Sequence, residues 1–386
     1  MIPSQPRTLG GASSQFPKPL KNFLSANRLP LLVIAFLSIS LYIQTIRFEY
    51  ALDDTMVIVK NQFTQRGIDG IGDIFKYESF RGYFGEQKKL LEGDRYRPLS
   101  IATFAIEKSV FGGSKEISHF INILLYALTG LLLFRVLLFM FPNDNSKKWY
   151  LTIPFMATML FIAHPLHVEV VANIKGRDEI IAFLGEMATL YFSFKYIYKN
   201  KNVYLSGSFF AFLIAILSKE SAITFLVITP LTLHFFTKAT FLEKIKSTIP
   251  LVLGTVLYLF IRVKAIGYLL SSAVITDVMN NPFYGMSLAE KTATIFYTLL
   301  LYLKLLIFPH PLTHDYYPYQ IPKMTWGDWQ PVFSLLLHAV LMVVILRGII
   351  FKEKESPKIT AYCAAFYLIT LSIVSNLFVS VGTFMN

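Results

Sequence analysis

Long apolar runs constrain this chain of 386 residues more than any other feature of its sequence. Most of them can cross a hydrocarbon core about 30 Å thick as α-helices, which satisfy their backbone hydrogen bonds internally. The sequence therefore predicts an all-α polytopic membrane protein with about 9–10 transmembrane helices. The runs lie near 29–46, 119–141, 150–163, 180–198, 204–218, 221–237, 249–265, 292–309, 331–351 and 359–380.

The positions of the charges predict how these helices are oriented. The net charge is +12. Lys and Arg are concentrated in alternate loops, which is the pattern of cytoplasmic loops in membrane proteins. The excess of Lys and Arg therefore indicates how the spans are oriented in the membrane, and no nucleic-acid partner is expected. The residues that establish the pattern are Lys18, Lys21, Arg28, Lys147, Lys148, Lys195, Lys199, Lys201, Lys238, Lys244 and Lys246.

This topology gathers the unusual polar residues on one side of the membrane. With the N-terminus inside, the segments 48–118, 164–179 and 219–220 all fall on the extracytoplasmic face. Residues 1–28 are expected to form a disordered cytoplasmic tail, and 29–386 the transmembrane domain. The segment 48–118 is then the first extracytoplasmic loop.

That loop is predicted to contain interfacial helices. A turn at 69–75 opens a short helix, and an apolar-periodic helix over 100–111 is expected to lie on the membrane surface. Among the spans, the short runs 150–163 and 204–218 are expected to continue as helix past the bilayer core. The charge pattern also requires an odd number of crossings between 247 and 310, so the run 292–309 is expected to be re-entrant or interfacial.

Two adjacent acids, Asp53 and Asp54, follow the first span. Like charges this close raise the pKa of one of them, which suits a carboxylate that takes a proton from a hydroxyl. A helix N-cap or a solvated pair of loop acids is the alternative. Both carboxylates are expected at the surface, so Asn at either position should leave membrane insertion intact.

Further candidates flank the predicted interfacial helix. Pro98 fits the first position of that helix, which leaves Arg97 available to pair with an acid or a phosphate. An ordinary arginine at the membrane interface is the alternative. His119 and Asn122 share a helix face at the start of the second span, where packing hydrogen bonds are the alternative to a site.

The segment 163–179 is the richest in polar side chains. His164, His167 and Glu169 resemble metal ligands, but Pro165 breaks the helix that would place both histidines on one face. No Cys or HExxH spacing supports zinc, so a metal is the weaker alternative. Lys175 and Arg177 suit a phosphate head group better.

Two more segments carry candidate residues. Lys219 and Glu220 stand between two apolar runs, where charges are costly unless they are paired or face a cavity. His314 and Asp315 lie in an aromatic-rich segment, for which an acceptor-binding or lid role competes with an ordinary membrane-interface role.

Together these segments resemble the GT-C superfamily of polytopic glycosyltransferases. More narrowly, they resemble the protein O-mannosyltransferase-like group in which a membrane domain precedes tetratricopeptide repeats. Because that group continues past a Gly-Thr-Phe-Met-like segment into further spans and repeats, a C-terminally truncated domain is expected here. The matching residues are Leu52-Asp53-Asp54, Tyr96 to Ser100, Thr103-Phe104, His119, Asn122, His164 to Glu179, Ser218 to Ser221, His314 to Tyr316 and Ser375 to Leu377.

The resemblance implies roles for these residues. Asp53 or Asp54 would deprotonate an acceptor hydroxyl while the other acid orients it. A lipid phosphate would be held by cations from four positions, namely Arg177, Lys175, Lys219 and Arg97. The supporting or substrate-binding residues would be His119, Asn122, His164, His167, Glu169, Glu179, Glu220, His314 and Asp315.

The expected function is therefore an inverting membrane glycosyltransferase. By the resemblance, it would move mannose from a polyprenyl-phosphate lipid donor to the hydroxyl of a polypeptide or glycan acceptor. No resident cofactor is expected, and the need for a divalent metal is left open. The alternatives are a transporter or flippase of a lipid-linked saccharide, and an inactive truncated scaffold. The lack of Asn-x-Ser/Thr sequons in the outer loops favours a bacterial inner membrane with a periplasmic active face.

Overall fold

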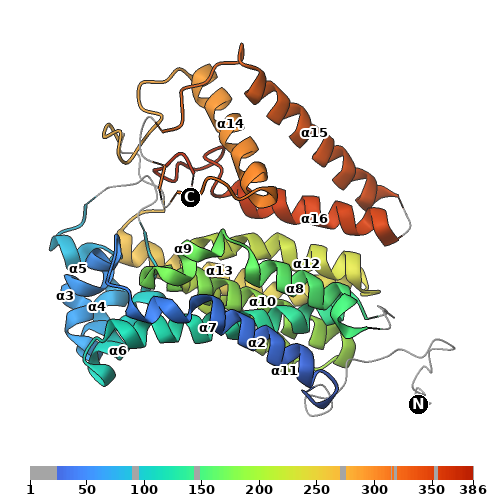
Figure 1. The fold of residues 1–386 in the computed structure, drawn as a ribbon, viewed down its shortest axis with the longest axis horizontal. Coiled ribbons are helices and arrows are strands. Elements are labelled where there is room, and N and C mark those ends of the chain that lie inside the picture. The colour runs from blue at the N-terminus through green and yellow to red at the C-terminus, as the bar shows by residue number, and fades with distance from the viewer. Residues whose placement is uncertain are drawn as a thin grey trace, which may run out of the picture.

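The apolar runs form helices that lie side by side in one bundle (Figure 1). This computed structural model describes residues 24–88, 95–142, 148–269, 275–313, 315–316, 320–351 and 355–385, and these ranges contain no strand. The bundle helices are α2 (Arg28–Tyr42), α7 (Lys115–Met140), α8 (Ile153–Ala163), α10 (Arg177–Lys199), α11 (Val203–Ser218), α12 (Phe225–Phe236) and α13 (Phe241–Ile266). The predicted all-α membrane fold is confirmed. Most of the predicted tail, residues 1–23, lies outside the described residues.

Length and composition identify the helices that can cross a membrane. Within the described ranges, five segments are long and apolar enough: Arg28–Arg47, Lys115–Met140, Ile174–Lys199, Phe241–Ile266 and Trp329–Ile350. Shorter apolar helices accompany them at Ile153–Ala163, Val203–Ser218, Glu220–Phe236 and Lys358–Ser372.

The bundle is held together by close helix contacts and by aromatic packing. On α10, a Cβ added at Gly185 would lie 2.8 Å from the carbonyl oxygen of Ala211, so α10 and α11 approach at a distance that only glycine allows. Between α7 and α10, the Phe139 and Phe194 rings stack with centroids 5.4 Å apart. Capping fixes the helix starts, as in α13, where Thr240 and Glu243 form a reciprocal capping box.

The first outer loop folds into short helices at one end of the bundle (Figure 1). Their buried side chains, including Val57, Ile74, Phe80 and Phe104, form a core of their own. The predicted turn and short helix at 69–75 are confirmed, and the longer helix begins at Pro98 as expected. The elements are a π-helical turn η2 (Thr55–Val59), α3 (Gln62–Gln65), η3 (Gly67–Gly70), α4 (Ile71–Lys76), α5 (Arg81–Phe84) and α6 (Pro98–Phe111).

Short elements connect the spans at their ends. The prediction that the runs 150–163 and 204–218 continue as helix past the bilayer core is wrong. Helix α8 ends at Ala163 because Pro165 favours extended backbone at His164, and α11 ends where Lys219 turns to extended backbone. The connecting elements are η1 (Ile43–Arg47), η4 (Trp149–Leu151), α9 (His167–Ala172), η5 (Ile174–Gly176) and η6 (Glu220–Thr224).

The last helices form a separate layer over the bundle. Figure 1 shows α14 (Leu288–Ile307) and α15 (Trp329–Ile350) steeply inclined to the bundle helices, while α16 (Glu355–Ser372) runs along them. Among the described helices, α14 is not one of those apolar enough to be a candidate span. That the 292–309 run is re-entrant or interfacial stays a prediction.

The final predicted span ends early. Helix α16 stops at Ser372, and the described residues after it form turns instead of continuing as helix to residue 380. The cause is Asn376, whose side chain donates to the carbonyl oxygens of Thr383 and Phe384 and accepts from the Val381 amide. A side chain that satisfies backbone groups in this way competes with helix formation.

Candidate active site

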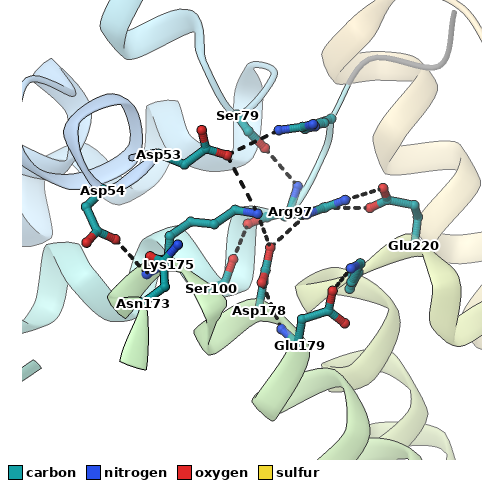
Figure 2. A network of polar contacts seen from close by, with 12 residues as sticks. Asp53, Asp54, Ser79, Arg97, Ser100, Asn173, Lys175, Asp178, Glu179 and Glu220 are labelled. Atoms are coloured by element: carbon teal, nitrogen blue, oxygen red, sulfur yellow. Dashed lines mark hydrogen bonds and ion pairs between the residues drawn. The ribbon is translucent and has the colours of Figure 1, made fainter. Parts of the chain in front are cut away.

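Three segments that the topology prediction placed on one face meet at the end of the bundle. Arg97 belongs to the first outer loop, Asp178 to the start of α10, and Glu220 to the start of η6, and hydrogen bonds join all three (Figure 2). Their convergence agrees with the predicted orientation. We call the connected set Asp53, Arg95, Lys175, Asp178, Arg97 and Glu220 the outer charge network.

The two adjacent acids point in different directions because the backbone turns sharply before them. Leu52 has a φ of 48°, in the left-handed region that side chains with a Cβ rarely adopt. The Asp54 amide then donates to the carbonyl oxygen of Ala51 at 3.0 Å. The chain continues into the π-helical turn η2. This local geometry gives the two carboxylates separate environments.

Asp54 is the inner carboxylate, with 1% of its surface exposed. Its Oδ2 accepts from the Ala51 amide at 2.9 Å, and its Oδ1 accepts from the Lys175 amide at 2.7 Å. Burial raises the pKa of Asp54, although the two amides favour the ionised form. The expected surface position is therefore wrong for Asp54, which connects the first loop to the segment before α10.

Asp53 is the outer carboxylate, and 33% of its side chain is exposed. Its Oδ2 lies 3.4 Å from Arg95 Nη1 and 3.9 Å from Lys175 Nζ. In the described part of the chain, its Oδ1 has no hydrogen-bond partner. Asp53 thus contacts both cations through Oδ2, and its Oδ1 has no partner among the described residues.

Lys175 and Arg95 differ from the other cations in exposure. Their side chains are 22% and 25% exposed, respectively. Both line a small cavity with apolar walls, so each can contact a ligand. The lining residues are Val57, Ser79, Phe80, Arg95, Arg97, Ser100, Ile101, Phe104, Lys175 and Asp178.

Arg97 is buried and already paired with two acids. Its Nε and Nη2 donate to Glu220 at 2.9 and 2.7 Å, and its Nη1 donates to Asp178 at 2.7 Å. Burial alone would lower the pKa of Arg97, but these two carboxylates raise it. Arg97 therefore joins the first loop to α10 and η6.

Arg177, the other predicted phosphate ligand, lies in a second cluster. Its side chain is fully buried, and all five of its N–H groups have partners. The Arg177 guanidinium also lies 4.3 Å from the centre of the Phe104 ring. In this position Arg177 supports the fold. The partners, which with Arg177 form what we call the buried arginine cluster, are Glu107, Thr103, Ser118 and Asn122.

His119 and Asn122 lie beside the buried arginine cluster. The Asn122 amide donates to the carbonyl oxygens of Asn173 and Ile174 while its oxygen accepts from Arg177. His119 is buried, and its ring packs edge-on against Phe48. Neither of them contacts the outer charge network through a hydrogen bond, so packing is the role that the contacts support.

The histidines of the 164–169 segment make backbone contacts. His164 Nδ1 accepts from the Leu166 amide, and its Nε2 lies 3.1 Å from the carbonyl oxygen of Leu306. His167 Nδ1 lies 2.8 Å from the carbonyl oxygen of Phe161, and burial lowers the pKa of His167 to about 4. Glu169 accepts from the side chain of Asn173.

These contacts bear on the metal alternative. Across the described ranges, no group of three or more His, Cys, Asp or Glu side chains is placed to hold a metal ion. His164, His167 and Glu169 therefore do not form a metal centre in this arrangement.

The remaining candidates have mixed positions. Lys219 is buried and pairs with Glu179, so it too has an acid rather than a ligand as its partner. The side chain of Asp315 is half-buried, outside the outer charge network. His314 lies outside the described residues.

Sequence reasoning missed three residues of the site region. Arg95 stands two residues before Arg97. In an extended chain, side chains two residues apart point to the same side, so this spacing could have indicated that both arginines belong to one site. Asp178 lies in the first turn of α10, where acids are common for reasons of helix polarity alone. Glu107 gave no signal, because only the fold places it against Arg177.

The comparisons with known proteins agree with the predicted resemblance. Protein O-mannosyl-transferase TMTC4 of Mus musculus and of Homo sapiens are each 24% identical to this chain, covering 91% of it and 52% of the relative. Protein O-mannosyl-transferase F38B6.6 of Caenorhabditis elegans is 26% identical, covering 91% of the chain and 48% of the relative. The resemblance to protein O-mannosyltransferases is thereby confirmed.

The matched relatives are longer than this chain, and the other two comparisons found no match. The chain spans about half the length of the curated relatives it matches. No family model matches the chain, and no solved structure matches it significantly. The relatives named above are animal proteins, so they lend no support to the predicted bacterial inner membrane.

Proposed function

We propose that this chain carries an inverting membrane glycosyltransferase. It moves a sugar, mannose by analogy with the names of the relatives, from a polyprenyl-phosphate donor to a hydroxyl of a polypeptide. The observation that carries the proposal is the position of Asp53. Its Oδ2 contacts Arg95 and Lys175, the two cations of the outer charge network whose side chains are most exposed, and its Oδ1 has no hydrogen-bond partner among the described residues.

The reaction needs a base and a site for negative charge. The acceptor oxygen attacks C1 of the sugar, the bond between C1 and the phosphate oxygen breaks, and the acceptor proton passes to the Asp53 carboxylate. The lipid product is a phosphate monoester, which carries one more negative charge than the donor. Fixed cations that meet this developing charge lower the barrier.

We assign the developing phosphate charge to Lys175 and Arg95. Arg97, Arg177 and Lys219 are almost fully buried, and each is already paired with an acid. Recruiting one of them would leave a carboxylate buried without its partner, which is strongly unfavourable. Lys175 and Arg95 have shared, longer contacts to Asp53 and can reorient toward a ligand.

Asp54 takes the orienting role in this proposal. Because both of its oxygens accept from backbone amides, it fixes the turn that carries Asp53. It also holds the backbone of Lys175 against the same turn. Asp54 therefore positions the base and one cation together.

The place of the network supports an enzyme over the transporter alternative. Transporters bind substrates near the bilayer midplane, in interrupted helices. Here the charges gather at helix ends, in segments that the topology assigns to the extracytoplasmic face. We place the donor phosphate and the acceptor on that face.

The proposal is tested with the purified chain in detergent. Polyprenyl-phosphate-mannose with a radiolabelled sugar is added with and without a mixed Ser/Thr peptide acceptor, and loss of label from the lipid is followed. Acceptor-dependent release is the expected result. Donor binding without release would contradict the enzymatic proposal for these residues, and transport of the intact lipid across proteoliposomes would favour the transporter.

A further inference from the structure

Asp178 holds two cations with one oxygen. Its Oδ2 accepts from Arg97 Nη1 at 2.7 Å and lies 3.3 Å from Lys175 Nζ (Figure 2). Its other oxygen accepts from the Glu179 amide at 2.8 Å. Asp178 is buried, so these contacts are protected from water. Of the acids in the outer charge network, it is the one that both Arg97 and Lys175 contact.

We propose that Asp178 is a positioning residue that holds the Lys175 ammonium between Asp53 and the donor phosphate. The inference rests on the proposed function. Lys175 Nζ is 3.3 Å from Asp178 but 3.9 Å from Asp53, so the ammonium is held mainly by the buried acid. The contact keeps Lys175 from closing fully onto Asp53, which remains available as a base.

The rest of the network fixes Asp178 in place. Arg97 binds Glu220 through two N–H groups, and its own amide donates to Ser79 Oγ at 3.1 Å. A planar guanidinium with this many fixed partners cannot rotate to follow a moving carboxylate. Asp178 is thus anchored by Arg97, whereas Lys175, on a flexible four-carbon chain, is the part that can move.

Loss of the Asp178 charge then has a specific consequence. Asp53 becomes the one acid within 4 Å of the Lys175 ammonium among those that the structure describes. The Lys175 ammonium would then move toward Asp53. There it would pair with the carboxylate that acts as the base, and it would no longer contact the donor phosphate. Donor affinity and the rate of the chemical step should both fall, and both effects should depend on Lys175.

The test is a double-mutant cycle on the full chain, with polyprenyl phosphate as the binding probe. Asp178→Asn should weaken binding roughly 10-fold, as expected when a charged hydrogen bond is disturbed. In the Lys175→Met background, Asp178→Asn should change binding by less than about 2-fold, because coupling between contacting residues is lost when one is removed. Equal weakening in both backgrounds would overturn the proposal.

Glu107→Gln is the matched control. It removes a buried acid that pairs with an arginine, as Asp178→Asn does, but Glu107 belongs to the buried arginine cluster and not to the outer charge network. It should lower the melting temperature, because Arg177 keeps its charge and loses its acid, yet leave the affinity for polyprenyl phosphate within about 2-fold of wild type. An affinity loss equal to that of Asp178→Asn would assign the effect to a general loss of packing and contradict the positioning role.

A second readout separates this inference from the proposed function. If the wild-type chain fails to bind polyprenyl phosphate, the proposed function fails, and the melting temperatures of the same variants still test the inference. Lys175→Met should then lower the melting temperature in the wild-type background and change it little in the Asp178→Asn background. Equal shifts in both backgrounds would show that Asp178 does not hold Lys175.

Discussion

Lys175 and Arg177 are two residues apart in the sequence, yet they belong to clusters of opposite character. Arg177 lies in the buried arginine cluster, where every N–H group already has a protein partner. Lys175 lies in the outer charge network, partly exposed and shared between Asp53 and Asp178. A basic residue next to a membrane surface can therefore be part of the fold or part of a site, and burial distinguishes the two.

The two clusters also differ in what their acids do. Glu107 neutralises Arg177, and both of its oxygens accept hydrogen bonds from protein groups. Asp53 is one-third exposed, has an oxygen without a partner among the described residues, and lies beside two partly exposed cations. The comparison assigns stability to the first cluster and chemistry to the second, and each of the following changes tests that assignment.

The largest effect is expected from removing the buried cation. Arg177→Met should lower the free energy of unfolding by about 3–5 kcal/mol, because Glu107 would remain charged and buried without its partner. The measurement is the melting temperature in detergent, together with the yield of monodisperse protein. Adding Glu107→Gln should recover part of the loss. A single variant that melts like wild type would contradict the structural assignment.

Replacing Lys175, the partly exposed cation, should affect binding more than stability. Lys175→Met should lower the melting temperature far less than Arg177→Met does, but should weaken polyprenyl-phosphate binding roughly 10-fold or more, since a charged hydrogen bond is worth about 1.5–3 kcal/mol. Lys115→Met is the matched control, because Lys115 is 23% exposed and also pairs with an acid, Glu49, outside the network. Equal weakening by both variants would show a general charge effect.

Asp54 joins the first outer loop to the segment before α10, and its raised pKa gives a pH signature. In the unfolded chain an Asp titrates near about 3.9, whereas burial raises the pKa in the folded state. Between these two values the folded state binds more protons, so this group makes stability fall as pH rises through that window. In Asp54→Asn that contribution should vanish from the stability-versus-pH curve. An unchanged slope would place the titration elsewhere.

Asp54→Asn should also cost stability at neutral pH. An amide can accept from only one of the two backbone N–H groups with its oxygen, so the loss should be about 1–3 kcal/mol. Asp53→Asn, at a position one-third exposed and with two long ion pairs, should cost much less.

The smallest effect concerns the strained turn before the acids. Leu52→Asn should raise stability by about 0.5–1 kcal/mol, because Asn tolerates the left-handed backbone better than Leu, and the Leu52 side chain is half exposed. Leu52→Val is the control and should lower stability, since β-branched residues adopt this backbone poorly. Melting curves of both variants test this prediction. A Leu52→Asn variant less stable than wild type would mean that the Leu52 side chain contributes through packing.

The sequence predicted the framework of this arrangement well. The apolar runs predicted the helices, and the alternating Lys and Arg predicted that 48–118, 164–179 and 219–220 would lie on the same face of the membrane. Pro98 and Pro165 predicted a helix start and a helix break, because proline acts through its own ring and missing N–H. These features depend on local chemistry or on membrane crossing, and both can be read from the chain alone.

The acid with which each buried arginine pairs could not be predicted in the same way. Nothing local to Arg177 selects Glu107, which lies 70 residues away, and nothing local to Arg97 selects Glu220, which lies 123 residues away. Arg97, Arg177 and Lys219 were therefore all predicted as phosphate ligands on the basis of charge. Asn376 ended the last helix through contacts up to eight residues ahead, which apolar composition does not reveal.

The account depends most on Asp53 as the base, and one measurement addresses this directly. Acceptor-dependent loss of label from polyprenyl-phosphate-mannose is compared for wild type, Asp53→Asn and Asp54→Asn, at matched amounts of folded protein and saturating donor. The prediction is that Asp53→Asn lowers the rate by about 10²-fold or more, the scale of losing a general base, while Asp54→Asn lowers it less and melts earlier. An Asp53→Asn variant that transfers at the wild-type rate would contradict the account.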